Sequence, residues 1–212
     1  MTTPHRRLRG EPGGRAPAPR TLRLVQEFIN TYNIERSHLG LRTDEFVSPA
    51  DLRRWLAAQG LLDRTARVRD ADLRRALGVR AALRRVLLAH NRIPASMTCL
   101  PAASRPAVGA AAATLSRLAR DARLVIRFRR DGTMWLEPET AGVTGALGRL
   151  LAAALAAQMD GTWDRLKACR RCHWAFYDHS KNRSGRWCVM SICGNRMKAQ
   201  AYRSHHRTGR QP

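Results

Sequence analysis

Residues 169–196 read CRRCHWAFYDHSKNRSGRWCVMSICGNR and contain four of the five cysteines in this 212-residue chain. The four are Cys169, Cys172, Cys188 and Cys193, with the spacing C-x2-C-x15-C-x4-C. Two close pairs of thiolates can surround one ion, and zinc favours such a tetrahedral set of sulfur ligands. The alternatives are an iron–sulfur cluster and two disulfides, and disulfides need an oxidising compartment for which no export signal is present. We predict one structural zinc ion, because four thiolates leave no coordination position for water or a substrate.

Two histidines in the same stretch are also candidate zinc ligands. His173 directly follows Cys172, and His179 lies seven residues beyond that cysteine. Either histidine would have to replace a cysteine, because four thiolates already complete the usual tetrahedron. We therefore predict that both lie outside the coordination sphere.

The segment between the two cysteine pairs combines aromatic and basic side chains. Residues 173–178 are predicted to form a short strand, and the residues after them a basic turn. The aromatic residues are Trp174, Phe176 and Trp187. Such rings can stack on bases, but a module this small has little else to bury, so we predict that they form its core. The basic residues of the turn are Lys181, Arg183 and Arg186, which we predict to contact phosphates; the alternative is a solvated loop.

A basic helix is predicted after the last cysteine. Arg196, Gln200, Arg203 and Arg207 are spaced i, i+4, i+7 and i+11, which places them along one helix face, and Lys198 adds a further cation. A zinc-anchored basic helix suits the DNA major groove, where arginine and glutamine contact base edges. The alternative is a solvated tail helix, which is less favoured because no acidic residue follows Asp178.

The charge distribution also indicates a polyanionic partner. The chain has 39 basic and 16 acidic residues, a formal net charge of +23. The bias toward arginine over lysine is typical of GC-rich coding, so the position of the charge is more informative than its total. Residues 165–212 contain 12 basic residues and one acidic residue. A segment this positive repels itself and attracts nucleic acid or another polyanion.

The rest of the chain predicts an α+β fold that is mainly helical. Apolar periodicity predicts helices over 22–32, 49–59, 68–90, 108–120 and 142–160, and Asp131-Gly132 between two apolar runs predicts a β-hairpin near 123–137. Ser48 is expected to cap the second helix and Asp70 the third. We expect a disordered basic tail over 1–20, a helical domain over 21–162, a separate zinc module over 163–207 and a short tail over 208–212.

Several function classes are excluded by what the sequence lacks. No run of about 18 uncharged apolar residues is present, since Arg149 interrupts 141–159, and no secretory signal precedes the first helix. We expect a soluble, cytoplasmic protein without a membrane partner. The sequence contains no nucleophile elbow, P-loop, zinc-protease helix or dinucleotide turn, and the fifth cysteine, Cys99, has no paired base. We therefore expect that the protein is not an enzyme.

The zinc module resembles the CGNR zinc-finger family. The motifs that carry the resemblance are Cys193-Gly194-Asn195-Arg196, preceded by Phe176-Tyr177-Asp178, Asn182-Arg183-Ser184 and Arg186-Trp187-Cys188. In that family the finger follows a region called ABATE, described as a stress-induced transcriptional regulator. Residues 21–160 resemble ABATE in their order of elements and in Phe28-Ile29-Asn30-Thr31 and Pro49-Ala50-Asp51-Leu52. The resemblance implies a bacterial transcription factor with zinc on the four cysteines, and it does not extend to 1–20.

Three functions remain open from the sequence. The first is a DNA-binding regulator whose helical domain senses a signal or dimerises. The second is an RNA-binding zinc module, because RNA presents the same phosphates. The third is a zinc-stabilised module that binds an acidic protein. Dimerisation is expected for the first, because a lone finger buries too little surface for high specificity.

Overall fold

The computed structural model describes residues 12–19, 21–33, 44–91 and 108–208. The helices are α1 (Leu22–Asn30), α3 (Pro49–Ala58), α4 (Asp70–His90), α5 (Val108–Asp121), α6 (Gly142–Met159) and α7 (Asn195–Thr208). The strands are β1 (Leu124–Phe128), β2 (Met134–Pro138), β3 (Leu166–Ala168) and β4 (Ala175–Tyr177). Three short helical turns are η1 (Pro12–Gly14), η4 (Trp163–Arg165) and the π-helical η5 (Met190–Gly194). The prediction of a mainly helical α+β chain is confirmed.

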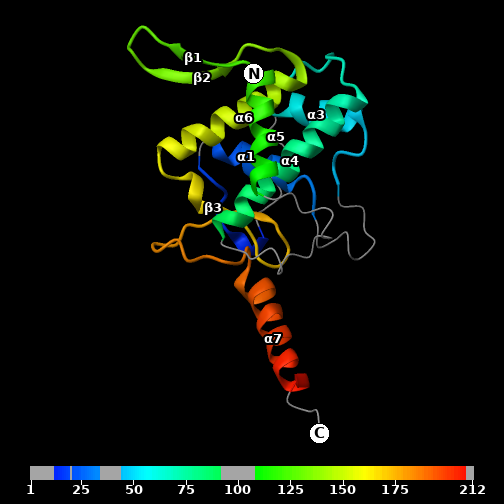
Figure 1. The fold of residues 1–212 in the computed structure, drawn as a ribbon, viewed down its shortest axis with the longest axis vertical. Coiled ribbons are helices and arrows are strands. Elements are labelled where there is room, and N and C mark those ends of the chain that lie inside the picture. Colours follow the sequence, from blue (N-terminus) through cyan, green and yellow to red (C-terminus); the bar gives the residue numbers. More distant parts are fainter. Residues whose placement is uncertain (1–11, 20, 34–43, 92–107, 209–212) are drawn as a thin grey trace.

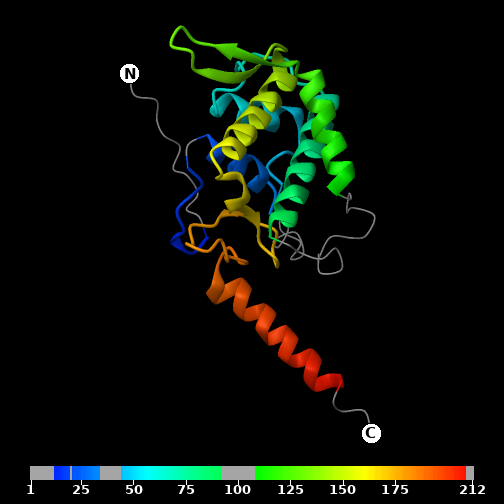
Figure 2. The same cartoon turned by 60° about the vertical axis from the view of Figure 1, so that its left-hand side comes forward.

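Helix α4 lies at the centre of the helical body and packs against α1, α3, α5, α6 and β3. The antiparallel β1–β2 hairpin leaves the body at one end of the long axis, and α7 projects from the opposite end (Figures 1 and 2). The second antiparallel pair, β3–β4, lies between the body and α7. The β1–β2 hairpin and α7 are therefore far apart in the fold.

Local sequence signals set the helix starts. Ser48 Oγ accepts from the backbone N–H of Asp51 at 3.3 Å, and the N–H of Ser48 donates to Asp51 Oδ2 at 3.0 Å, which completes the predicted capping box. The expected cap of the third helix is wrong by one residue. Asp70 is the first residue of α4, and the N–H of Arg69 donates to Asp72 Oδ2 at 2.9 Å instead.

The main core joins aromatic residues of α1 and α3 to the apolar faces of α4 and α6. Phe28 is fully buried, with its ring centroid 5.9 Å from that of Phe46 and 5.6 Å from that of Trp55. Helix α6 has the length and apolar composition of a membrane span, as the only such helix in the described part of the chain. Nine of its residues are buried in the core, so in this fold it is a central packing element.

Two arginines of α4 lie inside this core. Arg80 donates to both carboxylate oxygens of Asp44, at 2.7 and 2.5 Å, and its guanidinium lies 5.3 Å from the rings of Tyr32 and Phe46. Arg84 donates to the carbonyl oxygens of Ile29 and Tyr32. Burial, and secondarily the charge of Arg80, lowers the pKa of Arg84 to about 9. Both guanidiniums therefore hold the end of α1 against α4.

The zinc module is not the separate unit that the sequence suggests. Leu166, Ala168, Ala175 and Tyr177 of β3–β4 belong to the same buried cluster as the residues of α1, α4 and α6. This pair of strands is too short to bury a core of its own, so it uses the core of the body. The position of the zinc-binding turn is consequently fixed by the helical body.

Candidate zinc centre and basic surface

The four predicted cysteines come together beneath β3 and β4. Their sulfur atoms all lie within 4.8 Å of one another, and all four residues are buried. The Sγ–Sγ distances are 3.5 Å between Cys172 and Cys188, 3.7 Å between Cys188 and Cys193, and 3.7 Å between Cys193 and Cys172. Zinc–sulfur bonds of about 2.3 Å in a tetrahedron place sulfurs about 3.8 Å apart. The cluster therefore fits one structural zinc ion.

Backbone hydrogen bonds fix the two cysteine pairs. Cys169 follows β3; its N–H donates to the carbonyl of Trp174 at 2.9 Å and its carbonyl accepts from the N–H of His173 at 3.0 Å. His173 takes a positive φ of 57°, which closes the turn between β3 and β4. In the second pair, Cys193 lies on η5 and its N–H donates to the carbonyl of Val189 at 2.9 Å, and Cys188 directly precedes Val189. Both turns thus point their thiols into one space.

Gly194 explains one letter of the C-G-N-R motif. A Cβ at this position would lie 2.4 Å from Met190 Sδ and 3.1 Å from Trp187 Cδ1. The residue also links η5 directly to α7. A side chain here would therefore require the half-exposed Met190 side chain to move away from Trp187 and η5.

Proton sharing within the cluster lowers the pKa of two of the four thiols, Cys169 and Cys193. Hydrogen bonds from the neighbouring thiols of Cys172, Cys188 and Cys193 lower the pKa of Cys169, and the same sharing of protons raises the pKa of Cys172. A metal ion binds thiolates rather than thiols. Because the cluster already favours the thiolate form at two of its sulfurs, it is suited to binding a cation.

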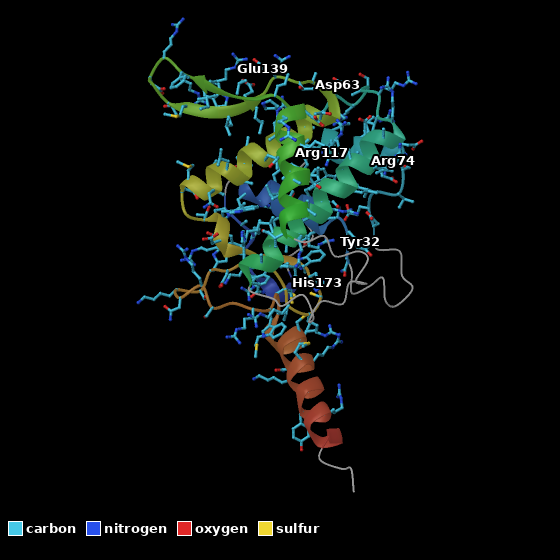
Figure 3. The ribbon with its side chains drawn as sticks, viewed as in Figure 1. Tyr32, Asp63, Arg74, Arg117, Glu139 and His173 are labelled. Carbon is cyan, nitrogen blue, oxygen red and sulfur yellow. The ribbon has the colours of Figure 1, made fainter. Side chains whose placement is uncertain are left out.

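The aromatic and histidine residues of the module have structural roles. Phe176 is fully buried against the four cysteines, and Trp174 and Trp187 pack on the same cluster, as predicted. His173 is buried at the junction of the body and α7 (Figure 3), and His179 is exposed with Nε2 at 3.1 Å from the carbonyl of Ala16. Within the described ranges, the cluster of metal-ligating side chains contains neither histidine.

A buried ion pair shapes the basic turn, and sequence reasoning missed it. Lys167 Nζ lies 2.8 Å from Asp178 Oδ2 and also donates to the carbonyls of Arg183 and Gly185. Asp178 is fully buried and accepts from the N–H of Gly185 at 2.7 Å. Burial raises the pKa of Asp178, but hydrogen bonds from Lys167, Ser180 and Gly185 outweigh it and lower the pKa to about 2. The lone acid of the C-terminal segment was the signal for this pair.

The turn that this ion pair holds displays cations to solvent. Lys181, Arg183 and Arg186 are exposed, as the predicted phosphate contacts require. A Cβ at Gly185 would lie 2.7–2.9 Å from the carboxylate of Asp178, so the turn depends on this glycine. Lys167, by contrast, is buried and supports the turn from within.

All five basic or polar positions predicted after the last cysteine lie within helix α7. Arg196, Lys198 and Arg203 are exposed, and the side chains of Gln200 and Arg207 lie outside the described residues. At about 100° per residue, positions 196, 200, 203 and 207 fall within about 60° of one another. Position 198 falls about 200° from 196, so Lys198 lies on another face. The expected helix face therefore has the required backbone geometry.

Three amide side chains of the body bind backbone groups of the module, and none of them was a candidate from sequence. Asn30 exchanges two hydrogen bonds with the backbone of Ala175, at 2.9 and 2.8 Å, and Gln26 donates to the same carbonyl at 3.3 Å. Asn91 at the end of α4 donates to the carbonyls of Ala168 and Arg186, at 2.7 and 3.0 Å. The body thereby holds both strands of the β3–β4 pair at their turn end, where Ala168 pairs with Ala175.

The prediction of a disordered tail over 1–20 is wrong for residues 12–19, which form an N-terminal strap along the zinc module. Arg15 donates to the carbonyls of Cys188 and Trp187, at 3.1 and 3.3 Å, and its guanidinium lies 5.0 Å above the ring of Phe176. Ala18 is buried, and its N–H donates to Gln26 Oε1 at 2.7 Å. These contacts use backbone groups and a single arginine, so apolar periodicity could not reveal them. Cys99 and residues 1–11 and 209–212 lie outside the described residues.

Two protein families match consecutive segments of the chain. The CGNR zinc finger family matches residues 165–206. The ABATE family, described as "Putative stress-induced transcription regulator", matches residues 22–161. No curated protein matches the chain. The chain belongs to the ABATE family and carries a CGNR zinc finger at its C-terminal end.

Proposed function

We propose that this protein is a zinc-dependent, DNA-binding transcriptional regulator that acts in the bacterial cytoplasm. Its zinc ion orients a basic helix, and its helical body senses a signal or dimerises. The function is binding rather than catalysis, because four thiolates complete the coordination sphere of zinc and leave no position for a substrate. The match to a transcription-regulator family supports the regulatory part of the proposal.

The observation that carries the proposal is the placement of α7. The helix starts two residues after Cys193 and extends away from the body (Figures 1 and 2). Its sequence, NRMKAQAYRSHHRT, contains four basic residues and no acidic residue. A polar helix of about 14 residues is marginal in isolation, so it needs a partner along its length. A polyanion supplies both the contacts and the opposite charge.

DNA fits α7 better than double-stranded RNA does. Positions 196 to 207 span about 16 Å along the helix, and the DNA major groove, about 12 Å wide, admits a helix. The major groove of A-form RNA is too narrow and deep for this kind of contact. In this arrangement Arg196, Gln200, Arg203 and Arg207 face the groove. The turn residues Lys181, Arg183 and Arg186, together with Lys198, contact phosphates.

The test uses the full zinc-loaded chain, because β3 and β4 share the core of the body. Fluorescence anisotropy on labelled duplex DNA over a salt series gives the dependence of log K on log salt. About six neutralised phosphates predict a slope near −5. The double variant Arg196→Gln/Arg203→Gln removes two of the proposed groove contacts and should weaken binding by about 1–3 kcal/mol for each arginine. Arg74→Gln is the matched control, since this exposed arginine lies on α4 away from α7 (Figure 3).

Each other outcome overturns part of the proposal. A slope near zero would exclude nucleic acid as the partner and would favour an acidic protein. Preference for RNA of equal length in competition replaces DNA by RNA. Binding that survives zinc chelation, or an effect of Arg74→Gln equal to that of the α7 variant, reduces the interaction to general polycation attraction.

A further inference from the structure

The β1–β2 hairpin presents an apolar face to solvent. Ile126, Phe128 and Met134 are 59%, 67% and 63% exposed. Phe128 pairs with Met134 across the strands and Ile126 pairs with Leu136, so all four side chains lie on one face, named here the hairpin face. Large apolar side chains grouped on one exposed surface are typical of an interaction site.

The hairpin face continues from the core of the molecule. At the base of the hairpin, Leu124 pairs with Pro138, which is buried against α6. Gly148 of α6 permits this approach, since a Cβ there would lie 2.8 Å from the Cβ of Ala122 and 3.1 Å from that of Pro138. The hairpin and α6 diverge from this shared base (Figures 1 and 2). Helix α6 adds Leu155 and Met159, which are 45% and 81% exposed.

The charged side chains on the opposite face of the hairpin have partners within the same chain. Arg127 lies 3.4 Å from a carboxylate oxygen of Glu139 and 3.8 Å from one of Glu137, and Arg123 lies 3.4 Å from Glu139. Arg129 lies 5.2 Å over the ring of Trp135. The polar face therefore needs no partner, whereas the apolar face leaves Ile126, Phe128 and Met134 in water.

We propose that two copies of this chain associate through the hairpin face to form a symmetric dimer. The choice of a second copy rests on charge. Residues 121–164 contain five arginines and six carboxylates, a net charge of −1, and the other residues together carry +24. Two such chains repel each other in most orientations, but not when these near-neutral regions meet. A twofold axis brings the same apolar patch of each copy together.

The position of the hairpin also suits a dimer of DNA-binding chains. Glu139 at the hairpin base lies toward one end of the molecule, and His173 lies on the far side of the helical body, where α7 begins (Figure 3). Pairing through the hairpin face keeps the two positive α7 helices apart and leaves both exposed. The inference does not depend on DNA binding, because the apolar face and the charge distribution stand without it.

Sedimentation of the full zinc-loaded chain without nucleic acid tests the dimer. Concentrations from about 1 to about 100 μM cover weak and moderate interfaces, and about 0.3 M salt shortens the range of charge repulsion. The wild type should show a monomer–dimer equilibrium. Phe128→Asp should weaken it about tenfold or more, because a charge would enter the apolar centre of the interface. Ile126→Asp should act in the same direction.

Val108→Asp is the matched control, since Val108 is 44% exposed on α5 and lies outside the hairpin face. Zinc content and the circular dichroism spectrum should stay unchanged in all three variants. A wild-type chain that remains monomeric throughout overturns the proposal, and so does a dimer that Phe128→Asp and Ile126→Asp leave intact. Because no DNA is present, these outcomes are separate from a failure of DNA binding.

Discussion

The described part of the chain contains two antiparallel two-stranded sheets, one covered on both faces by the rest of the chain and one largely exposed. The β3–β4 pair has three residues in each strand, all six of them buried. The β1–β2 pair has five residues in each strand, and its exposure increases from the base to the tip. The shorter pair is held by Asn30, Gln26 and Asn91 of the body and by the zinc-binding turn, whereas the longer pair is buried only where it meets α6.

This difference shows that strand length does not decide whether a two-stranded sheet is stable. An isolated hairpin is marginal in water and depends on what covers its faces. In β3–β4 the covering groups come from the same chain. In β1–β2 one face has no cover within the described residues, and we assign that role to a second copy.

Of the changes considered, removal of zinc should lower the stability of the chain most. Structural zinc supplies on the order of 10 kcal/mol, which is comparable with the stability of a whole domain. Since β3–β4 lies in the main core, chelation or Cys188→Ser should destabilise the helical body as well, and thermal melting followed by helix circular dichroism should show one cooperative transition at a much lower temperature. Cys99→Ser is the matched control and should retain zinc. A body that melts unchanged without zinc would contradict the shared core.

Replacing one phenylalanine of β3–β4 and one of β1–β2 by alanine compares the stability of the two sheets directly. Phe176→Ala should lower the free energy of unfolding by about 3–5 kcal/mol, because Phe176 is fully buried against the cysteines. Phe128→Ala should change it by less than about 0.5 kcal/mol in dilute solution, where the proposed dimer contributes little. Urea denaturation of both variants measures the difference. Equal effects would show that the tip of β1–β2 is buried within the monomer.

The ion pair beneath the basic turn should give a smaller effect. Asp178→Asn leaves Lys167 buried without its charge partner and should destabilise the chain by about 3 kcal/mol. Glu27→Gln removes the partner of Arg23 in a more exposed i, i+4 pair and should cost less than about 1 kcal/mol. Urea midpoints of both variants against the wild type provide the measurement.

The pH dependence of stability gives a control for the same pair. The pKa of Asp178 is lowered from 3.8 to about 2. Between these two pH values the folded state therefore binds fewer protons than the unfolded state. The stabilisation by the carboxylate is therefore complete above about pH 4 and is lost as the pH falls toward 2. The difference between wild type and Asp178→Asn should narrow over this range; a constant difference would show that the charge of Asp178 is not what stabilises the turn.

The sequence predicted what depends on local spacing. The four cysteines, the Ser48–Asp51 capping box and the Asp131-Gly132 hairpin are each encoded within a few residues of one another. Such patterns have fixed geometric requirements, so they can be recognised without a structure.

The contacts that join the two parts of the chain could not be predicted in this way. The bond from Asn30 to the backbone of Ala175 spans 145 residues, and the carbonyl that accepts it gives no signal in the sequence. Arg80 and Arg84 have the residue type of a solvated helix face, but Asp44 and the end of α1 satisfy them in the interior. The N-terminal strap was missed for the same reason, since Arg15 binds carbonyl oxygens.

The shared core around β3–β4 limits how this zinc finger can be exchanged between proteins. Fingers that fold alone can be joined in series or moved to a new protein as independent cassettes. A cut at the start of this one would remove the amides of Asn30, Gln26 and Asn91 from the carbonyls that they bind. A graft that preserves these contacts must therefore transfer the finger together with α1 and the end of α4.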